Sequence, residues 1–430
     1  MMKKELTAAL LIPLLSLGIV GCTSNEGDDV SIDIGGGPVT PTDPTEPTDP
    51  SDGDCNLVVP ADFVAFNDDC SVGTLSGLID ENYTLISEVE WRLSGEVLVG
   101  EGNRSLANAA DVQSVRDADV TLTVEAGTQV RGFADGSLLV TRGSKLMAEG
   151  TATNPITFSS LDTDFDGLGE WGGVVIQGFA PQYGPGGTGA CFGSGVVCNV
   201  QGEGGTVVGL YGGNDPADDS GSLRYVRIAE GGLVDGPNNE INGLTLQGVG
   251  YATTLEYIQV HSNLDDGIEW FGGTANLKYA VLTGNDDDDI DFDEGYMGNI
   301  QYALIIKDQT APAPQGSNDP RAIEANSSDA DYVPETEAVL ANITILGGPL
   351  NNSEDSDAGP QPGMRLRGAL MTSIFNTSVA NFDTGCIRID DADVNGDGSV
   401  IVESNVTLTN ILNDCQDGIY DKRAADSAAN

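Results

Sequence analysis

Short segments in the middle of the chain alternate apolar and polar positions and resemble one another. The last three of the four similar segments begin 22 and 23 residues apart. Period-two alternation indicates β-strands, and a repeat of this length fits one coil of a parallel β-helix, whose strands stack about 4.8 Å apart. We therefore predict an all-β, right-handed parallel β-helix. The four segments are Leu223–Ile228, Leu255–Val260, Leu277–Leu282 and Ile300–Ile305.

A second, shorter segment repeats in the same register. Ile268-Glu269-Trp270 and Ile290-Asp291-Phe292 stand 22 residues apart, and each has a polar residue between two apolar ones. Because successive side chains of a strand point to opposite faces, the outer two residues belong to the core and the middle one points outward. Similar triplets occur at residues 244–246 and 387–389.

Three segments of different composition precede the repeats. Lys3 and Lys4 stand before an apolar stretch that ends at Val20, which is typical of a secretory signal over residues 1–21. Residues 22–54 form a Pro/Thr/Asp-rich stretch with prolines at intervals of three, so we expect an extended, disordered tether. Residues 55–120 are predicted to cap the exposed first edge of the β-helix, which then spans residues 121–425.

The end of the signal segment carries a motif of its own. Ile19-Val20-Gly21-Cys22 resembles the bacterial lipobox, in which the cysteine is lipidated and becomes the mature N-terminus. The resemblance implies that acyl chains on Cys22 bind the protein to a membrane. Thr23 follows the cysteine, and by resemblance to known sorting patterns this favours the bacterial outer membrane or cell surface. The alternative is an ordinary cleaved signal.

Composition excludes two classes of protein. The chain has 67 acidic and 18 basic residues, for a net charge of −49, so it lacks the clustered Lys and Arg that a nucleic-acid binder needs. No second apolar run approaches the roughly 20 residues of a spanning helix, which excludes a polytopic membrane protein.

The cysteines other than Cys22 number six, which favours disulfides in an exported chain. Proximity in sequence suggests that neighbours pair, although other pairings are formally open and a metal-thiolate site is the rival interpretation. The suggested pairs are Cys55–Cys70, Cys191–Cys198 and Cys386–Cys415.

Acidic residues coincide when the two 22-residue coils are aligned. Asp265 then lies over Asp287, and Asp266 lies over Asp288. Like charges about 5 Å apart cost roughly 3 kcal/mol per pair at an effective dielectric constant of 20, so we predict a bound hard cation, Ca²⁺, with a solvated acidic face as the alternative. The candidate ligands are Asp265, Asp266, Glu269, Asp287, Asp288, Asp291 and Asp293.

Two loops match the opening of a calcium-binding loop, in which alternate oxygens converge and glycine permits a sharp turn. Neither has Glu at the twelfth position, which is Gly173 in the first and Val402 in the second, so both matches are partial. Their candidate ligands are Asp162, Asp164 and Asp166 in the first loop, and Asp391, Asp393, Asn395 and Asp397 in the second.

Three further stretches carry a family resemblance. EGTATNPITF at residues 149–158, EWGGVVI at 170–176 and DDGIEWFGG at 265–273 resemble a largely uncharacterised family of bacterial exported β-helix lipoproteins. The resemblance covers most of the chain from about Glu88 to Gln309. It implies the pectin-lyase-like fold and carries no established activity.

These observations favour a lipid-anchored, calcium-stabilised β-helix that acts as a surface binding or scaffold protein for a glycan or an envelope protein. The alternative is a calcium-dependent polysaccharide lyase or a glycoside hydrolase. If Glu324, Arg365 and Arg388 extend the outward row of Glu269 and Asp291, the face resembles lyases of this fold, in which Arg365 or Arg388 would remove a proton. His261 stands four residues before Asp265 and is a weaker acid–base candidate.

Overall fold

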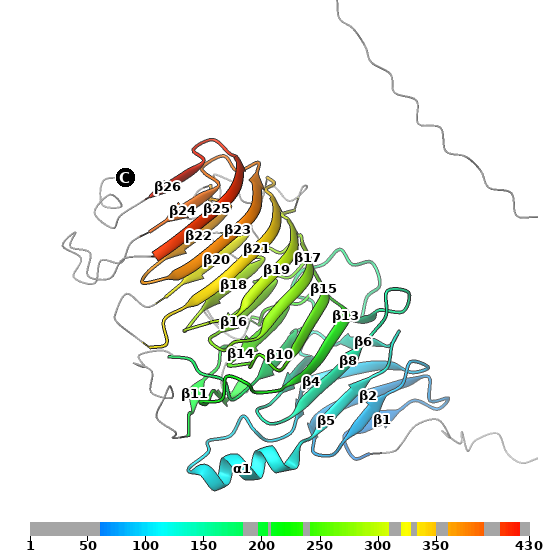
Figure 1. Cartoon of the computed structure of the whole chain (residues 1–430). Helices are drawn as coiled ribbons and strands as arrows, with labels where there is room; N and C mark the ends of the chain where they lie inside the picture. The colour runs from blue at the N-terminus through cyan, green and yellow to red at the C-terminus, as the bar shows by residue number, and fades with distance from the viewer. Residues whose placement is uncertain are drawn as a thin grey trace, which may run out of the picture. The chain divides into compact units, whose positions relative to one another are not determined.

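The computed structural model describes residues 61–183, 197–204, 208–234, 241–308, 320–327, 333–349, 360–390 and 405–421. Their strands form a 24-stranded sheet that winds into a stack of coils, and a separate two-stranded sheet pairs β11 (Val200–Gln201) with β12 (Leu210–Tyr211) (Figure 1). All pairings in the large sheet are parallel except β1 (Val64–Phe66) with β2 (Val72–Ile79). The predicted right-handed parallel β-helix is confirmed.

From β13 onward each coil consists of one long and one short strand. The long strands are β13 (Gly221–Ala229), β15 (Thr254–His261), β17 (Asn276–Thr283), β19 (Asn299–Ile306), β21 (Glu337–Leu346), β23 (Met371–Ala380) and β25 (Asn405–Asp414). The short strands are β14 (Leu244–Gln247), β16 (Ile268–Phe271), β18 (Ile290–Asp293), β20 (Ile323–Asn326), β22 (Met364–Arg367), β24 (Ile387–Ile389) and β26 (Ile419–Asp421).

The coils begin earlier than residue 121, where the sequence placed their start. β2 already pairs in parallel with β4 (Glu90–Val99), and the register shifts between Leu75 and Gly77. That irregularity breaks the two-residue period, so the alternation of apolar and polar positions does not reveal this coil. The other early strands are β3 (Tyr83–Leu85), β5 (Thr121–Val124), β6 (Gln129–Gly132), β7 (Ser137–Val140), β8 (Lys145–Glu149), β9 (Ile156–Ser160) and β10 (Val174–Gln177).

One helix, α1 (Ala109–Ala118), interrupts the early coils and was not predicted. The side chain of Asn108 accepts hydrogen bonds from the backbone amides of Ala110 and Asp111, so it caps the first turn. Among the helical residues only Val115 is buried. The helix therefore lacks the apolar stripe that would have revealed it in the sequence.

Residues one sequence repeat apart pair with each other in neighbouring coils. Leu255 pairs with Leu277, and Leu277 pairs with Ile300. The next partners along the same column are Leu340 and Ile374, 40 and 34 residues further on, because longer connections intervene. These inward residues belong to a single hydrophobic core that runs through the stack and includes the fully buried Trp91, Trp171 and Trp270.

A disulfide joins Cys386 to Cys415, as expected from their proximity, with 5.4 Å between the Cα atoms. Cys70 and Cys198 are also disulfide-bonded. Their suggested partners Cys55 and Cys191 lie outside the described residues, as do the signal segment, Cys22, the tether and the loop with Asp391, Asp393, Asn395 and Asp397. Within the ranges given above, no helix has the length and apolar character needed to cross a membrane.

Candidate functional site

The outward residues of the short strands stand in one continuous row. The register places the middle residue of each triplet directly beside its counterpart in the next coil, and the row survives the longer connection between β19 and β20. Its charge changes along the stack from neutral to acidic to basic. We call Thr245, Glu269, Asp291, Glu324, Arg365 and Arg388 the short-strand row.

Further carboxylates lie in the turns that precede the short strands. The backbone amide of Asp288 donates a hydrogen bond of 2.9 Å to Oδ1 of Asp266, so the two acids lie in neighbouring coils on the same side of the stack. Carboxylate oxygens come within 4.8 Å of one another in three overlapping groups, which together we call the carboxylate cluster. The groups are Asp265, Asp266 and Asp287; Asp266, Glu269 and Asp291; and Asp288, Asp291 and Glu324.

Burial makes the negative charge of this cluster costly. Burial raises the pKa of Asp266 well above its usual range, and the neighbouring carboxylates of Asp265 and Asp288 raise it further. Burial and the Glu203 carboxylate likewise raise the pKa of Glu269. Side chains in such surroundings either take up protons or bind a counter-charge.

The basic partners of the cluster gather around Glu324. Burial alone would raise the pKa of Glu324, but Arg321, Arg367 and Arg365 together hold it below its usual range. Arg321 bonds to Glu324 and lies 3.4 Å from Asp288, and its side chain is 1% exposed. Glu269, by contrast, accepts a hydrogen bond of 2.5 Å from the neutral amide of Asn242. Counter-charge therefore sits at one end of the cluster.

Three buried oxygens have no hydrogen-bond partner among the described residues; two belong to the short-strand row, and the third is on Asp293 at the end of the same strand as Asp291. They are Oδ1 of Asp291, Oδ1 of Asp293 and Oγ1 of Thr245. Thr245 is 1% exposed and is the row neighbour of Glu269. An unsatisfied buried polar atom costs about 1–3 kcal/mol, which a bound ion removes. Because the clustered ligand atoms are all oxygens, these residues offer the ligand chemistry that Ca²⁺ prefers.

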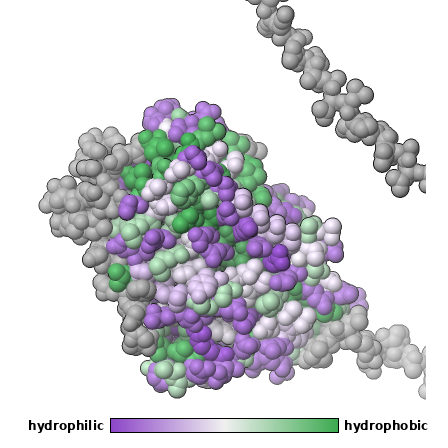
Figure 2. All heavy atoms as spheres, in the orientation of Figure 1, coloured by the Kyte–Doolittle hydropathy of each residue, from purple (hydrophilic) through white to green (hydrophobic). Residues whose placement is uncertain are grey.

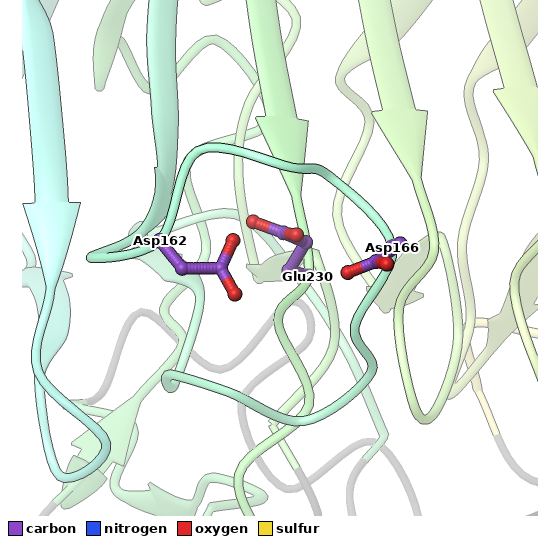
Figure 3. A group of neighbouring side chains, drawn as sticks. All are labelled: Asp162, Asp166 and Glu230. Carbon is purple, nitrogen blue, oxygen red and sulfur yellow. The ribbon is translucent and has the colours of Figure 1, made fainter.

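A second acidic group forms beside the loop at residues 161–170. Asp162, Asp166 and Glu230 bring carboxylate oxygens within 4.8 Å of one another, and Figure 3 shows the three side chains converging. Asp164 is not part of this group; its backbone amide donates to Oδ1 of Asp162. Glu230 is fully buried and accepts a hydrogen bond of 2.9 Å from Oγ of Ser160.

Sequence reasoning missed Glu230, which lies more than sixty residues from its partners. It reaches them because β13 pairs with β9, which aligns Ile228 with Phe158. Glu230 follows β13 at the level where Ser160 ends β9. Only that register, which crosses an irregular connection, could have indicated the contact.

The candidate catalytic residues are engaged by other side chains. Nε of Arg365 lies 3.1 Å from Oδ2 of Asp390, and Nη2 of Arg388 lies 2.7 Å from the same oxygen. Nδ1 of His261 lies 2.8 Å from Oγ1 of Thr283, on the long strands rather than in the short-strand row. The two arginines thus share one carboxylate, as in a structural ion-pair network.

Residues 77–429 match a family model described as a pectate-lyase like beta helix domain. The chain belongs to this family. The match agrees with the resemblance that the sequence carries to pectin-lyase-like proteins. No curated protein is significantly similar to the chain.

Solved structures with a similar fold are remote in sequence. The periplasmic alginate epimerase AlgG has a TM-score of 0.31 and 9% identity, over 85% of this chain and 81% of that chain. Two structures of the Streptococcus pneumoniae surface adhesin PfbA have TM-scores of 0.27 and 0.30 and 12% identity. They cover 81% and 82% of this chain and 90% and 85% of those chains. These likenesses concern the fold alone.

Proposed function

We propose that this protein is a calcium-stabilised β-helix of the bacterial envelope that acts as a surface binding or scaffold protein for a glycan or protein partner. The observation that carries the proposal is the carboxylate cluster with the adjoining Thr245, since buried oxygens of Asp291 and Thr245 have no hydrogen-bond partner in the part of the chain that the structure describes. Stacked coils repeat these acids at strand spacing, so their repulsion persists along the row unless a cation offsets it. The remaining outer surface of the stack is then free to bind a partner.

Calcium is favoured over magnesium by the character of the donors. The cluster offers many carboxylate oxygens from different coils, and Ca²⁺ accepts six to eight oxygen ligands in flexible geometry. Mg²⁺ demands a near-ideal octahedron and usually retains several waters. We expect Asp266, Glu269 and Asp291 to hold the ion, since these three bring their oxygens together.

Thermal unfolding with and without calcium tests the proposal. A ligand that binds only the folded state at 100 times its Kd stabilises it by about 2.7 kcal/mol, so calcium added to chelator-treated protein should raise Tm. Asp291→Asn should largely abolish this increase, whereas Asp80→Asn, at an exposed position outside the cluster, should preserve it. Equal melting temperatures with calcium and with chelator would refute calcium binding.

We propose attachment to the membrane through a lipid on Cys22, which is supported by the lipobox-like sequence. Several acyl chains at about 0.8 kcal/mol per buried methylene would hold the chain durably. Cys22→Ser should move the protein from the membrane fraction to the soluble fraction. A variant that stays with the membrane would rule out this anchor.

The lyase or hydrolase alternative would use the same row differently. It requires Arg365 or Arg388 to leave the ion pair with Asp390 and act as a base. We favour the binding function because both guanidinium groups are committed to that carboxylate. Unsaturated products released from acidic glycans by the protein, and lost in Arg388→Ala, would reverse this preference.

A further inference from the structure

The outward positions on the second half of the long strands form a face of a different kind. Three columns run along the stack in register. The corner column is Tyr225, Tyr257, Tyr279, Tyr302, Asn342, Asn376 and Asn410. From β15 to β23 the middle column is Gln259, Val281, Leu304, Thr344 and Ser378, and the third is His261, Thr283, Ile306, Leu346 and Ala380. In β25 the two columns continue with Leu412 and Asp414. We call the three columns between β15 and β23 the uncharged face.

From β15 to β23 these columns contain no Asp, Glu, Lys or Arg, although charged residues make up 20% of the chain and its net charge is −49. Charged residues stand only at the two ends, with Arg227 before Gln259 and Asp414 after Ala380. At that frequency several of the positions would carry a charge. Lys278 borders the face, with Nζ 4.9 Å from the ring centre of Tyr279 and 5.8 Å from that of Tyr302. The uncharged face is therefore a neutral strip on a strongly acidic body.

The corner column repeats the same groups in the same conformation. The four tyrosine rings stack nearly parallel, with centres 4.3, 4.5 and 5.1 Å apart. The asparagines continue the column, and Nδ2 of Asn376 and of Asn410 each donate to the preceding asparagine. Each coil thus places either a tyrosine or an asparagine at this corner, in the same left-handed conformation.

The tyrosines stand where the backbone disfavours them. Tyr279 and Tyr302 have φ values of 64° and 61°, a left-handed conformation that asparagine adopts more readily than an aromatic residue. The later coils place asparagine at this corner, with Asn342 at 59°. Four successive coils instead hold an aromatic ring, at a cost in backbone energy. We infer that the tyrosine rings make a contribution, to stability or to binding, that asparagine cannot make.

Part of that contribution is exposed apolar surface. Tyr302 is 43% exposed, and Val281 and Leu304, which are paired in register beside it, are 39% and 38% exposed. Hydroxyl and amide groups of Thr344 and Asn342 follow in the next coil. Figure 2 shows exposed hydrophobic residues among polar ones on the coils nearest the C-terminal end. The uncharged face thus alternates apolar patches with hydrogen-bonding groups.

We propose that the uncharged face binds a neutral, linear polysaccharide that lies along the stack of coils. This inference deepens the proposed binding function and rests on it. A sugar ring presents apolar C–H surface and hydroxyls together, which matches aromatic rings and aliphatic side chains beside Asn, Thr and Gln. A polymer of equivalent units suits a surface whose groups recur at the strand spacing of about 4.8 Å.

The charge of the molecule argues against other ligands. The uncharged face offers no counter-charge to an ionic group, and a body of net charge −49 repels anionic polymers. A second copy of the chain would bring the same large negative charge. A purely apolar partner would cover the side-chain amide of Gln259 and the hydroxyl of Thr344 without offering them hydrogen bonds. A neutral, hydroxyl-rich polymer meets none of these penalties.

Affinity electrophoresis of the full chain in native gels tests the proposal, with hydroxyethylcellulose, mannan and dextran as neutral polymers and alginate and polygalacturonate as acidic ones. We expect retardation by at least one neutral polymer and none by the acidic polymers when calcium is removed. Tyr302→Ala and Leu304→Glu should each weaken binding at least tenfold. Tyr251→Ala and Val234→Glu are matched controls, since these residues are 56% and 50% exposed and lie outside the three columns.

The proposal is overturned if none of the three neutral polymers retards the protein, or if the two face variants bind like their controls. Sedimentation equilibrium adds a further outcome: a dimer that Leu304→Glu dissociates would assign the uncharged face to self-association instead. The calcium-dependent rise in Tm does not involve this face. A protein that shows the rise but binds no neutral polymer would retain the proposed cation site and lose only this inference.

Discussion

The two outward faces of the β-helix are built from the same coils but differ in charge. The short strands place Glu269, Asp291 and Glu324 side by side, whereas the long strands place Tyr257, Tyr279 and further neutral residues side by side. When the same residue type recurs in successive coils, its interaction with its neighbours is repeated at every step of the stack. Repeated carboxylates accumulate repulsion and need a counter-charge, while repeated neutral groups stack and bond to one another without that cost.

The largest effect is expected where the acidic face supplies its own counter-charge. Arg321→Ala would leave Asp288 and Glu324 buried without their shared guanidinium group, so we expect a loss of about 3–5 kcal/mol in the free energy of unfolding, measured with urea. Arg92→Ala is the control, since Arg92 pairs with Glu90 at the surface and should change stability by about 1 kcal/mol or less. Equal effects would show that burial does not distinguish the two ion pairs.

A smaller effect is expected from pH in the metal-free protein. Burial raises the pKa of Glu294 from 4.5 to about 7, despite a hydrogen bond from Tyr211, and it raises the pKa of Asp266 and Asp291. The folded state therefore holds protons that the unfolded chain has lost. The resulting stability is fully present below the unfolded-state pKa values and is lost as the pH rises through the folded-state values.

We therefore expect chelator-treated protein to lose about 1–3 kcal/mol of stability between pH 4.5 and pH 7, measured by thermal or urea unfolding at each pH. Saturating calcium should reduce or reverse this slope, because the ion replaces the protons as counter-charge. If stability depends on pH in the same way with and without calcium, the acidic cluster does not bind the ion.

The smallest effect is expected on the uncharged face. Tyr279→Asn loses stacking with Tyr257 and Tyr302, worth about 0.5–1.5 kcal/mol per pair, but relieves the left-handed backbone strain. We expect these terms nearly to cancel, so the unfolding free energy should change by no more than about 1 kcal/mol. Tyr279→Val loses the same stacking and gains a β-branched side chain at positive φ, so it should destabilise clearly more. Equal destabilisation would show that backbone strain contributes little.

Much of the candidate site could be predicted because it lies in the regular coils. Asp266 and Asp288 are 22 residues apart. Because the two coils have the same length, residues one period apart lie side by side in the stack. Glu230 and Arg321 could not be predicted in this way, because connections of unequal length separate them from their partners. Asp164 shows the converse: the loop motif suggested it as a ligand, yet the fold brings Asp162 to Asp166 and Glu230 without it.

The sequence alone determined the architecture, the inward and outward sets of residues, and the meeting of acids in the two 22-residue coils. These follow from local alternation and a constant period, which need no knowledge of distant contacts. Only the tertiary structure decided that Glu324, Arg365 and Arg388 continue the short-strand row, and that the neutral residues of the long strands join into one face. The row and the face both depend on how strands pair after connections of irregular length. Burial of the apolar side chains in the common core decides that pairing.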